Sequence, residues 1–125
     1  VIERADVLSL HCSLNAQDAR MMNVESFARM KRGAMFVNVT RGGLVEEAAL
    51  ADALKSGHLA GAGVDVTSKE PLPMDSPLRS APNIVITPHM AWYSVQAESN
   101  LKTRCAEEAV RGFRGEKPRC PVNKR

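Results

Sequence analysis

Four short apolar runs, with helix-like or turn-rich segments between them, constrain the fold of this chain most. Residues 5–12, 34–39, 59–66 and 84–88 each have the length and the apolar content of a buried strand. Strands that alternate with helices are joined by right-handed crossovers and form a parallel sheet. The sequence therefore predicts the α/β class, with a Rossmann-like parallel sheet and flanking helices. Because the third run is rich in small residues, we also expect another segment to pack closely against it.

The segments between the runs carry signals for helices and for one long loop. Asn23 can cap a short helix over residues 24–30, and Gly33 marks its exit. Residues 68–83 are rich in proline and predict a long loop, which in a compact domain is typically functional or disordered. Residues 93–113 predict one long helix.

The clearest helix pattern covers residues 45–57. Glu46 and Glu47 favour the positive end of a helix dipole. Lys55 and Gly57 close the helix. One face of this predicted helix is apolar and consists of Leu50, Ala53 and Leu54.

Size, charge and cysteine content bound the class of protein. The chain has 125 residues, of which 44% are hydrophobic, and this fits one globular domain. No apolar run approaches the ~20 residues that a membrane span needs, and no secretory leader pattern is present, so we expect no membrane partner. The chain opens in mid-pattern on Val1 and Ile2, which indicates that an earlier segment precedes it. The three cysteines are odd in number and lack a CxxC pair, which favours reduced thiols in the cytoplasm or nucleus and no metal site.

The net charge of +3 raises the question of nucleic-acid binding. Most of the excess lies after Lys102, and the single Trp92 and Tyr93 lie upstream of it. A solvated helix face and a polar tail explain such charges more simply than a nucleic-acid surface does. We therefore expect no direct nucleic-acid partner.

Polar residues follow all four predicted strands. Cys12, Arg41, Asp65 and His89 lie at or just past the strand ends. In open parallel sheets, ligands bind beyond the carboxyl ends of the strands. These four side chains are therefore expected to line one ligand-binding edge.

Arg41 precedes Gly42 and Gly43, which give it room and let a ligand approach the main chain. A planar guanidinium group matches a carboxylate with two parallel hydrogen bonds. The alternative is a surface arginine beside a helix-capping turn, and the residue alone does not separate the two.

His89 and Glu70 could form an acid–base pair at the same edge. A histidine is the natural proton donor near neutral pH, and a carboxylate beside it would orient the ring. Taken singly, each residue has a plain alternative, a structural histidine and an exposed loop glutamate. The hypothesis depends on the combination of cation, histidine and carboxylate.

Several segments resemble one known family in order and spacing. They are "ADVLSLHCSLNAQ" (5–17), "MKRGAMFVNVTRGGLVEEAALADALKSGHLAGAGVDV" (30–66), "EPLP" (70–73) and "SPLRSAPNIVITPH" (76–89). The sequence is similar to the second half of the nucleotide-binding domain of the D-isomer-specific 2-hydroxyacid dehydrogenases. The likeness covers residues 5–114, and its core, residues 37–50 with "DV", "EP" and "TPH", is highly specific.

The resemblance implies an NAD-dependent hydride-transfer site. Arg41 matches the arginine that binds the substrate carboxylate. His89 matches the acid–base histidine that protonates the carbonyl oxygen of a 2-keto acid, and Glu70 matches its carboxylate partner. Asp65 matches a residue that faces the nicotinamide carboxamide. The other cofactor positions that the resemblance implies are Cys12, Ser13, Leu14, Asn15, Val39 and Thr40, with Arg41, His89 and Trp92 beside them.

Within the family, "HCSLNAQ" (11–17), "PHMAWYS" (88–94) and "CPVNK" (120–124) look like the C-terminal binding protein branch, whose animal members act as transcriptional corepressors. By this likeness Trp92 would lie over the substrate and favour a bulky 2-keto acid; the alternative is a hydrophobic anchor between sheet and helix. Homodimers are typical of the family. Three alternatives stay open: a dinucleotide-sensing corepressor that binds transcription-factor peptides, a metabolic hydroxypyruvate or phosphoglycerate-type reductase, and, weakest, a basic nucleic-acid module.

The chain departs from the full family pattern at the cofactor's other end. It has no G-x-G-x-x-G turn and no acidic residue placed to bind the adenosine ribose, so NAD and NADP are not distinguished. We expect the second half of a Rossmann domain over residues 1–92, a helix crossing toward the substrate domain over 93–116, and a remnant of that domain over 117–125. The 125 residues alone are expected to bind NADH weakly and to be inactive.

Overall fold

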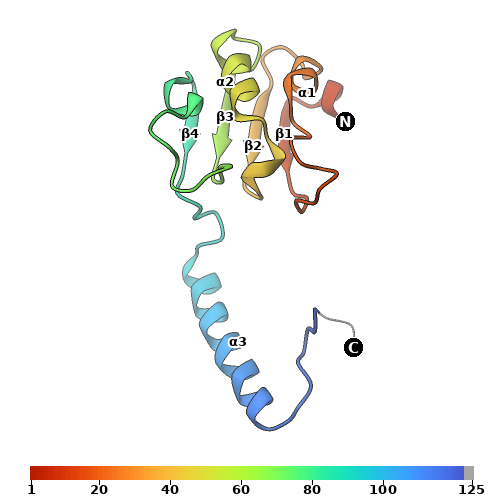
Figure 1. Cartoon of the computed structure of the whole chain (residues 1–125), viewed down its shortest axis with the longest axis vertical. Coiled ribbons are helices and arrows are strands. Elements are labelled where there is room, and N and C mark those ends of the chain that lie inside the picture. The colour runs from red at the N-terminus through yellow and green to blue at the C-terminus, as the bar shows by residue number, and fades with distance from the viewer. Residues whose placement is uncertain (123–125) are drawn as a thin grey trace. The chain divides into compact units, whose positions relative to one another are not determined.

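A computed structural model describes residues 1–122, and the chain divides into two compact units, Val1–Ala91 and Trp92–Arg125. The first unit contains a parallel sheet of four strands in the order β1-β2-β3-β4. The strands are β1 (Val7–Leu10), β2 (Met35–Asn38), β3 (Gly61–Val64) and β4 (Ile84–Ile86), and the helices are α1 (Val24–Ala28) and α2 (Glu47–Lys55) (Figure 1). This confirms the predicted α/β class with a Rossmann-like parallel sheet.

Short 3-10 helices occupy three of the connections. They are η1 (Ile2–Arg4), η2 (Gly42–Leu44) and η3 (Pro77–Ser80). The last lies within the predicted proline-rich loop, where the Ser76 side chain accepts a hydrogen bond from the Leu78 amide and Pro77 supplies a suitable first residue.

Both helices of the first unit begin and end near the expected residues. The Asn23 side chain accepts a hydrogen bond from the Ser26 amide at 3.0 Å, as the predicted cap of α1 requires. Helix α2 ends at Lys55, and Gly57 follows with a φ of 66°, which glycine adopts without strain. The predicted apolar face of α2 is confirmed at Leu50 and Leu54, which are fully buried.

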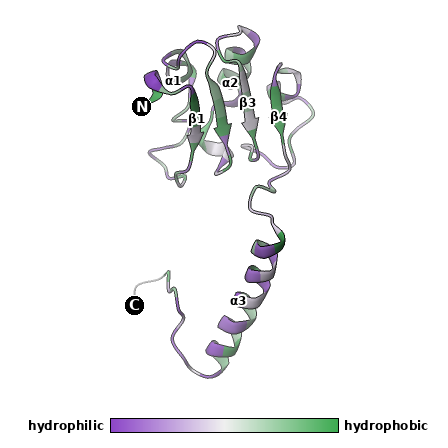
Figure 2. Ribbon diagram, turned by 180° about the vertical axis from the view of Figure 1, so that it is seen from behind, coloured by the Kyte–Doolittle hydropathy of each residue, from purple (hydrophilic) through white to green (hydrophobic). Residues whose placement is uncertain are grey.

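The core lies on one face of the sheet only. Each strand is added on the same side of the preceding one, so right-handed crossovers place α1 and α2 over the same face. There Phe27 of α1 meets Phe36 of β2 edge-to-face, with ring centroids 5.2 Å apart, and both rings are buried. Figure 2 shows the sheet from the opposite face, over which this unit places no helix among its described residues.

That opposite face corrects one prediction. The first run was expected to form a buried strand, but its burial alternates: Leu8 and Leu10 are buried, whereas Val7 is 59% exposed. Met35, which pairs with Val7, and Val85 lie on the same face of the sheet, and the two residues are 52% and 66% exposed. Strands that are apolar on both faces are typical of a sheet with helices on both faces. The described residues of this unit place helices on one face only.

The expected close packing at β3 is found at one of its two glycines. A side chain at Gly61 would meet the Asn83 carbonyl oxygen at 3.1 Å, whereas a Cβ atom at Gly63 would meet nothing within 4 Å.

The second unit consists of α3 (Val95–Phe113) and a tail. The Ser94 side chain caps the helix by accepting a hydrogen bond from the Ala97 amide, so the helix begins two residues later than predicted. Two of its arginines pair within the unit: Arg111 with Glu108 and Glu116, and Arg119 with Glu107 and Glu108. The quoted residues 120–124 lie partly outside the described residues.

Two negative findings concern residues 1–122. Across these residues, no helix is long and apolar enough to cross a membrane. The same residues contain no group of three or more His, Cys, Asp or Glu side chains that could hold a metal ion. Cys12, Cys105 and Cys120 are all exposed free thiols.

The one-sided core makes a prediction about β2. Phe36→Ala in the 125-residue chain should lower the free energy of unfolding by about 3–5 kcal/mol, because it removes a fully buried ring and leaves a cavity. Met35→Ala, one residue away on the open face, should cost less than about 1 kcal/mol. Urea denaturation followed by circular dichroism measures both, and similar losses for the two variants would contradict the one-sided core.

Candidate active site

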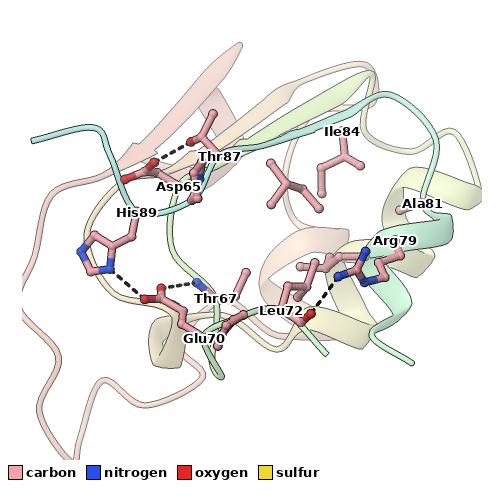
Figure 3. A pocket seen from close by; sticks show the side chains of 13 residues that line it. Asp65, Thr67, Glu70, Leu72, Arg79, Ala81, Ile84, Thr87 and His89 are labelled. Atoms are coloured by element: carbon pink, nitrogen blue, oxygen red, sulfur yellow. Dashed lines mark hydrogen bonds and ion pairs between the residues drawn. The ribbon is translucent and has the colours of Figure 1, made fainter. Parts of the chain in front are cut away.

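A buried carboxylate organises the turn after β4. Asp65 follows β3 and is 5% exposed. Its carboxylate accepts a hydrogen bond from the Thr87 hydroxyl at 2.5 Å (Figure 3). It also accepts bonds from the amides of Met90 and Ala91, both at 2.8 Å. Its backbone carbonyl accepts a further bond from the His89 amide at 2.8 Å. Asp65 is thus hydrogen-bonded to residues before and after His89 and fixes the turn that carries this histidine.

The ionisation of Asp65 reflects these contacts. Burial alone would raise the pKa of this carboxyl, but the hydrogen bonds from Thr87, Ala91 and Met90 lower it overall from its ordinary 3.8. The side chain is therefore charged at neutral pH and accepts bonds from all three donors. Both carboxylate oxygens are engaged by the chain itself, and the expected contact with a nicotinamide stays a prediction.

His89 has an unusual backbone conformation. Its φ is 54°, in the left-handed region that non-glycine residues seldom adopt, at a cost of order 1–3 kcal/mol. The hydrogen bonds that Asp65 accepts from the amides of His89, Met90 and Ala91 hold the residue there. Strain of this kind, maintained by surrounding contacts, is typical of functional positions.

His89 and Glu70 face each other across the site. His89 Nδ1 lies 2.8 Å from Glu70 Oε2, and the other carboxylate oxygen accepts a hydrogen bond from the Thr67 amide at 3.1 Å (Figure 3). The bond with His89 and, next, the bond from Thr67 lower the pKa of Glu70 from its ordinary 4.5. Glu70 is therefore an ionised partner that fixes the orientation of the ring.

Arg41 is presented by a turn that a buried asparagine organises. Asn38, at the end of β2, is 1% exposed. Its side-chain oxygen accepts bonds from the amide and hydroxyl of Thr40, and its side-chain nitrogen donates to the Arg41 carbonyl at 2.9 Å. The exposed Arg41 guanidinium donates one bond, at 2.7 Å, to the Thr40 carbonyl. The hydrogen bonds of Asn38 therefore fix the backbone of the turn, and the guanidinium group of Arg41 is exposed.

The glycines after Arg41 have a different role from the expected one. A side chain at Gly42 would lie 2.0 Å from the carbonyl carbon of Thr67, so the group that approaches this glycine is the chain's own backbone. A side chain at Gly43 would lie 2.8 Å from the Leu14 side chain. Neither glycine has a positive φ. Gly42 therefore brings the Arg41 turn and the Glu70 loop into direct contact.

The three predicted catalytic side chains share one hollow. Arg41, Glu70 and His89 border a cavity of about 290 Å³, with Leu14 on its wall. A larger cavity, of about 850 Å³, is also bordered by Glu70 and His89, together with Leu72, Ile84 and Ile86 (Figure 3). The cation of the larger cavity is Arg79, whereas the smaller cavity places Arg41 beside Glu70 and His89.

The remaining predicted positions are less tightly grouped. Of the residues expected along the cofactor, Leu14 borders the smaller cavity. The others do not border it, although they follow β1 or β2: Cys12, Ser13, Asn15, Val39 and Thr40. Trp92 belongs to the second unit, where its ring packs edge-on against Tyr93 at 5.5 Å, and its role over the substrate stays a prediction.

Three supporting residues were not singled out from the sequence. Asn38, Thr67 and Thr87 hold Arg41, Glu70 and Asp65 respectively. Asn38 carries a usable signal, because an asparagine two residues before a threonine at a strand end favours a local side-chain turn. Thr67 acts through its amide, which no side-chain pattern reveals.

Together, a parallel sheet with an exposed arginine and a histidine–carboxylate pair beyond the carboxyl ends of its strands is the arrangement of an α/β domain that binds a ligand at that edge. Residues 1–91 match the family described as D-isomer specific 2-hydroxyacid dehydrogenase, NAD binding domain. The chain belongs to this family.

Relatives agree with the family match. The chain is 46% identical over 105 residues to a putative 2-hydroxyacid dehydrogenase of Haemophilus influenzae (81% of this chain, 33% of that protein). It is 42% identical over 123 residues to a glyoxylate reductase of Korarchaeum cryptofilum (98% and 37%). The chain thus spans about a third of the length of these relatives.

Two solved structures are similar to this one. The TT0316 protein of Thermus thermophilus has a TM-score of 0.91 and 42% identity, over 98% of this chain and 39% of that one. The D-lactate dehydrogenase of Lactobacillus jensenii, solved with NAD+, has a TM-score of 0.89 and 30% identity, over 98% and 41%.

The Asp65 network predicts a pH-dependent contribution to stability. Because the folded pKa is lowered, the stabilisation is complete above pH 3.8 and is lost as the pH falls through the folded pKa. Asp65→Asn should lower the free energy of unfolding at pH 7 by about 2 kcal/mol, since an amide cannot accept from all three donors. It should also flatten the loss of stability below about pH 4. Urea denaturation at several pH values tests this, and an unchanged acid dependence would count against the network.

Proposed function

We propose that residues 1–91 supply the catalytic residues of an NAD(H)-dependent oxidoreductase that reduces a 2-keto acid to a D-2-hydroxy acid. The observation that carries the proposal is the single cavity bordered by Arg41, Glu70 and His89. This activity is proposed for an enzyme of full family length that contains this segment, which is named the full-length enzyme. Family membership supports the reaction class.

Arg41 would bind the substrate carboxylate. Its guanidinium group extends from a turn whose base Asn38 fixes, and its fork can form two parallel hydrogen bonds to a carboxylate. The adjacent carbonyl group of a 2-keto acid would then lie in the cavity that His89 also borders.

His89 would protonate the carbonyl oxygen. With Nδ1 facing the ionised Glu70, the transferred proton is carried by Nε2, and the pair stabilises the negative charge that develops on oxygen in the transition state. Asp65 maintains the turn that directs the ring. In the reverse direction the same ring accepts the proton from the hydroxy acid.

The edge of the sheet fits the nicotinamide end of a dinucleotide. Leu14, which is 42% exposed, provides apolar surface on the cavity wall, and Val39, which follows β2, is 37% exposed. Cys12, Ser13, Asn15 and Thr40 would lie along the cofactor in this proposal. The bound nicotinamide supplies the hydride.

Arg41 provides the first test. In the full-length enzyme, Arg41→Ala should raise KM for the 2-keto acid by about a hundredfold, through the loss of charge-assisted hydrogen bonds, and leave NADH affinity nearly unchanged. Arg41→Lys should have an intermediate effect, because it keeps the charge but loses the fork. Steady-state kinetics and nicotinamide fluorescence titration measure the two quantities. An unaltered KM in Arg41→Ala would remove its assigned role.

Variants of the His89–Glu70 pair provide the second test of the proposed function. His89→Gln should lower kcat by about a thousandfold at unchanged NADH affinity, as expected for loss of a general acid. Reduction needs the protonated ring. In Glu70→Gln the neutral amide no longer stabilises the charged ring or fixes its orientation, so kcat should also fall. Near-normal turnover in either variant would contradict the assignment.

Finer features are also proposed on the sequence alone. They are kinship with the C-terminal binding protein branch, a preference for bulky 2-keto acids set by Trp92, a homodimeric enzyme, and location in the cytoplasm or nucleus. The named relatives are metabolic dehydrogenases or reductases and do not support a corepressor role. Comparing turnover of glyoxylate with that of a 2-keto acid with a large apolar side chain tests the proposed preference.

A further inference from the structure

The loop that carries Glu70 has no helix or strand of its own between β3 and η3. The Glu70 side chain is 40% exposed, so packing around it is incomplete. Contacts with neighbouring elements must therefore determine where its carboxylate lies. One of these contacts is the close approach of Thr67 to Gly42. Arg79 of η3 makes a second contact, donating to the Leu72 and Pro73 carbonyls at 2.8 Å.

Glu47, the first residue of α2, makes a third contact. Its Oε1 accepts a hydrogen bond from the Ser68 amide at 2.6 Å, and its Oε2 lies 3.5 Å from the Ser76 hydroxyl, which can donate to it. A hydrogen bond from an amide to a carboxylate is charge-assisted and about twice as strong as a neutral one. One side chain thus attaches both the start and the end of the Glu70 loop to the same helix.

Two consecutive amides in this loop bind two carboxylates. The Thr67 amide donates to Glu70, and the Ser68 amide donates to Glu47. A peptide unit is planar, so the Ser68 amide and the Thr67 carbonyl turn together, and that carbonyl packs against Gly42. If the Ser68 amide were released, the peptide could rotate and redirect the chain that leads to Glu70.

We propose that Glu47 is a positioning residue for the Glu70–His89 pair, because through Ser68 it fixes the loop that presents the Glu70 carboxylate to the ring. This rests on the function proposed for that pair. Glu46 provides a matched contrast at the same helix end, since its side chain makes no capping hydrogen bond. Both glutamates interact with the helix dipole, so a comparison of the two removes that shared effect.

Kinetics of the full-length enzyme test the proposal. Glu47→Ala should lower kcat by about tenfold, as expected when a catalytic group is displaced slightly, with KM changed less than about twofold. Glu47→Gln should keep at least about half of the activity, because its amide oxygen still accepts from Ser68. Glu46→Ala should keep wild-type kcat. A Glu47→Ala enzyme that loses thermal stability but keeps wild-type kcat would overturn the proposal.

Glu47→Asp covers the case in which Glu47→Ala does not fold. It keeps the negative charge at the helix end but is one methylene shorter, so it should fold and still lose kcat by about tenfold. Wild-type kcat in this variant would contradict the proposal, because the Glu47 carboxylate would then not need to reach the Ser68 amide.

A double variant tests whether Glu47 acts through Glu70. Glu47→Ala combined with Glu70→Gln should have the kcat of Glu70→Gln alone, because residues that act in one chain of contacts are not additive. Effects that multiply would show that Glu47 acts elsewhere and would overturn the proposal.

Amide hydrogen exchange, followed by NMR, gives a measurement independent of activity. In Glu47→Ala, the amides of Ser68 and Thr67 should both exchange at least about tenfold faster, and in Glu46→Ala neither should change. If His89→Gln and Glu70→Gln turned over normally, the proposed function would fail, and exchange would still decide whether Glu47 holds the loop. Unchanged exchange at Thr67 would overturn the Glu47 proposal by itself.

Discussion

The buried carboxylate of Asp65 is the interaction on which the site depends. It lies at the end of β3 and accepts hydrogen bonds from Thr87, Met90 and Ala91, while its carbonyl accepts from His89. A buried charge is costly unless it is fully hydrogen-bonded, and here the bonds also hold His89 in a strained conformation. The same contacts that stabilise the ionised carboxyl therefore direct the histidine toward Glu70.

The parallel sheet brings the other groups to this point. Its strands all end at one edge, so Arg41 after β2 and His89 after β4 meet across β3. The absence of a side chain at Gly42 lets the loop carrying Glu70 lie directly against the Arg41 turn. Cation, carboxylate and histidine thus come from three strand ends and border one small cavity.

Much of this could be predicted from the sequence. The four strands, both helices of the first unit and the Asn23 cap follow local patterns, and the structure contains each of them. The convergence of Arg41, Glu70 and His89 also follows, because the edge rule for parallel sheets is general. The exposed face of β1 could not be predicted in the same way. A run that is apolar on both faces has the same sequence whether or not a second layer covers it.

The sequence by itself determined the fold class, the strand ends and the chemical types of the groups at the edge of the sheet, because these depend on local periodicity and on residue identity. Only the tertiary structure decided which partners those groups take. In the structure, the Thr67 backbone packs against Gly42, and both carboxylate oxygens of Asp65 accept hydrogen bonds from the 87–91 turn. Glu47 accepts a hydrogen bond from the Ser68 amide. These contacts join residues about 20 or more positions apart, often through backbone amides that every residue possesses, so no pattern of side chains along the chain specifies them.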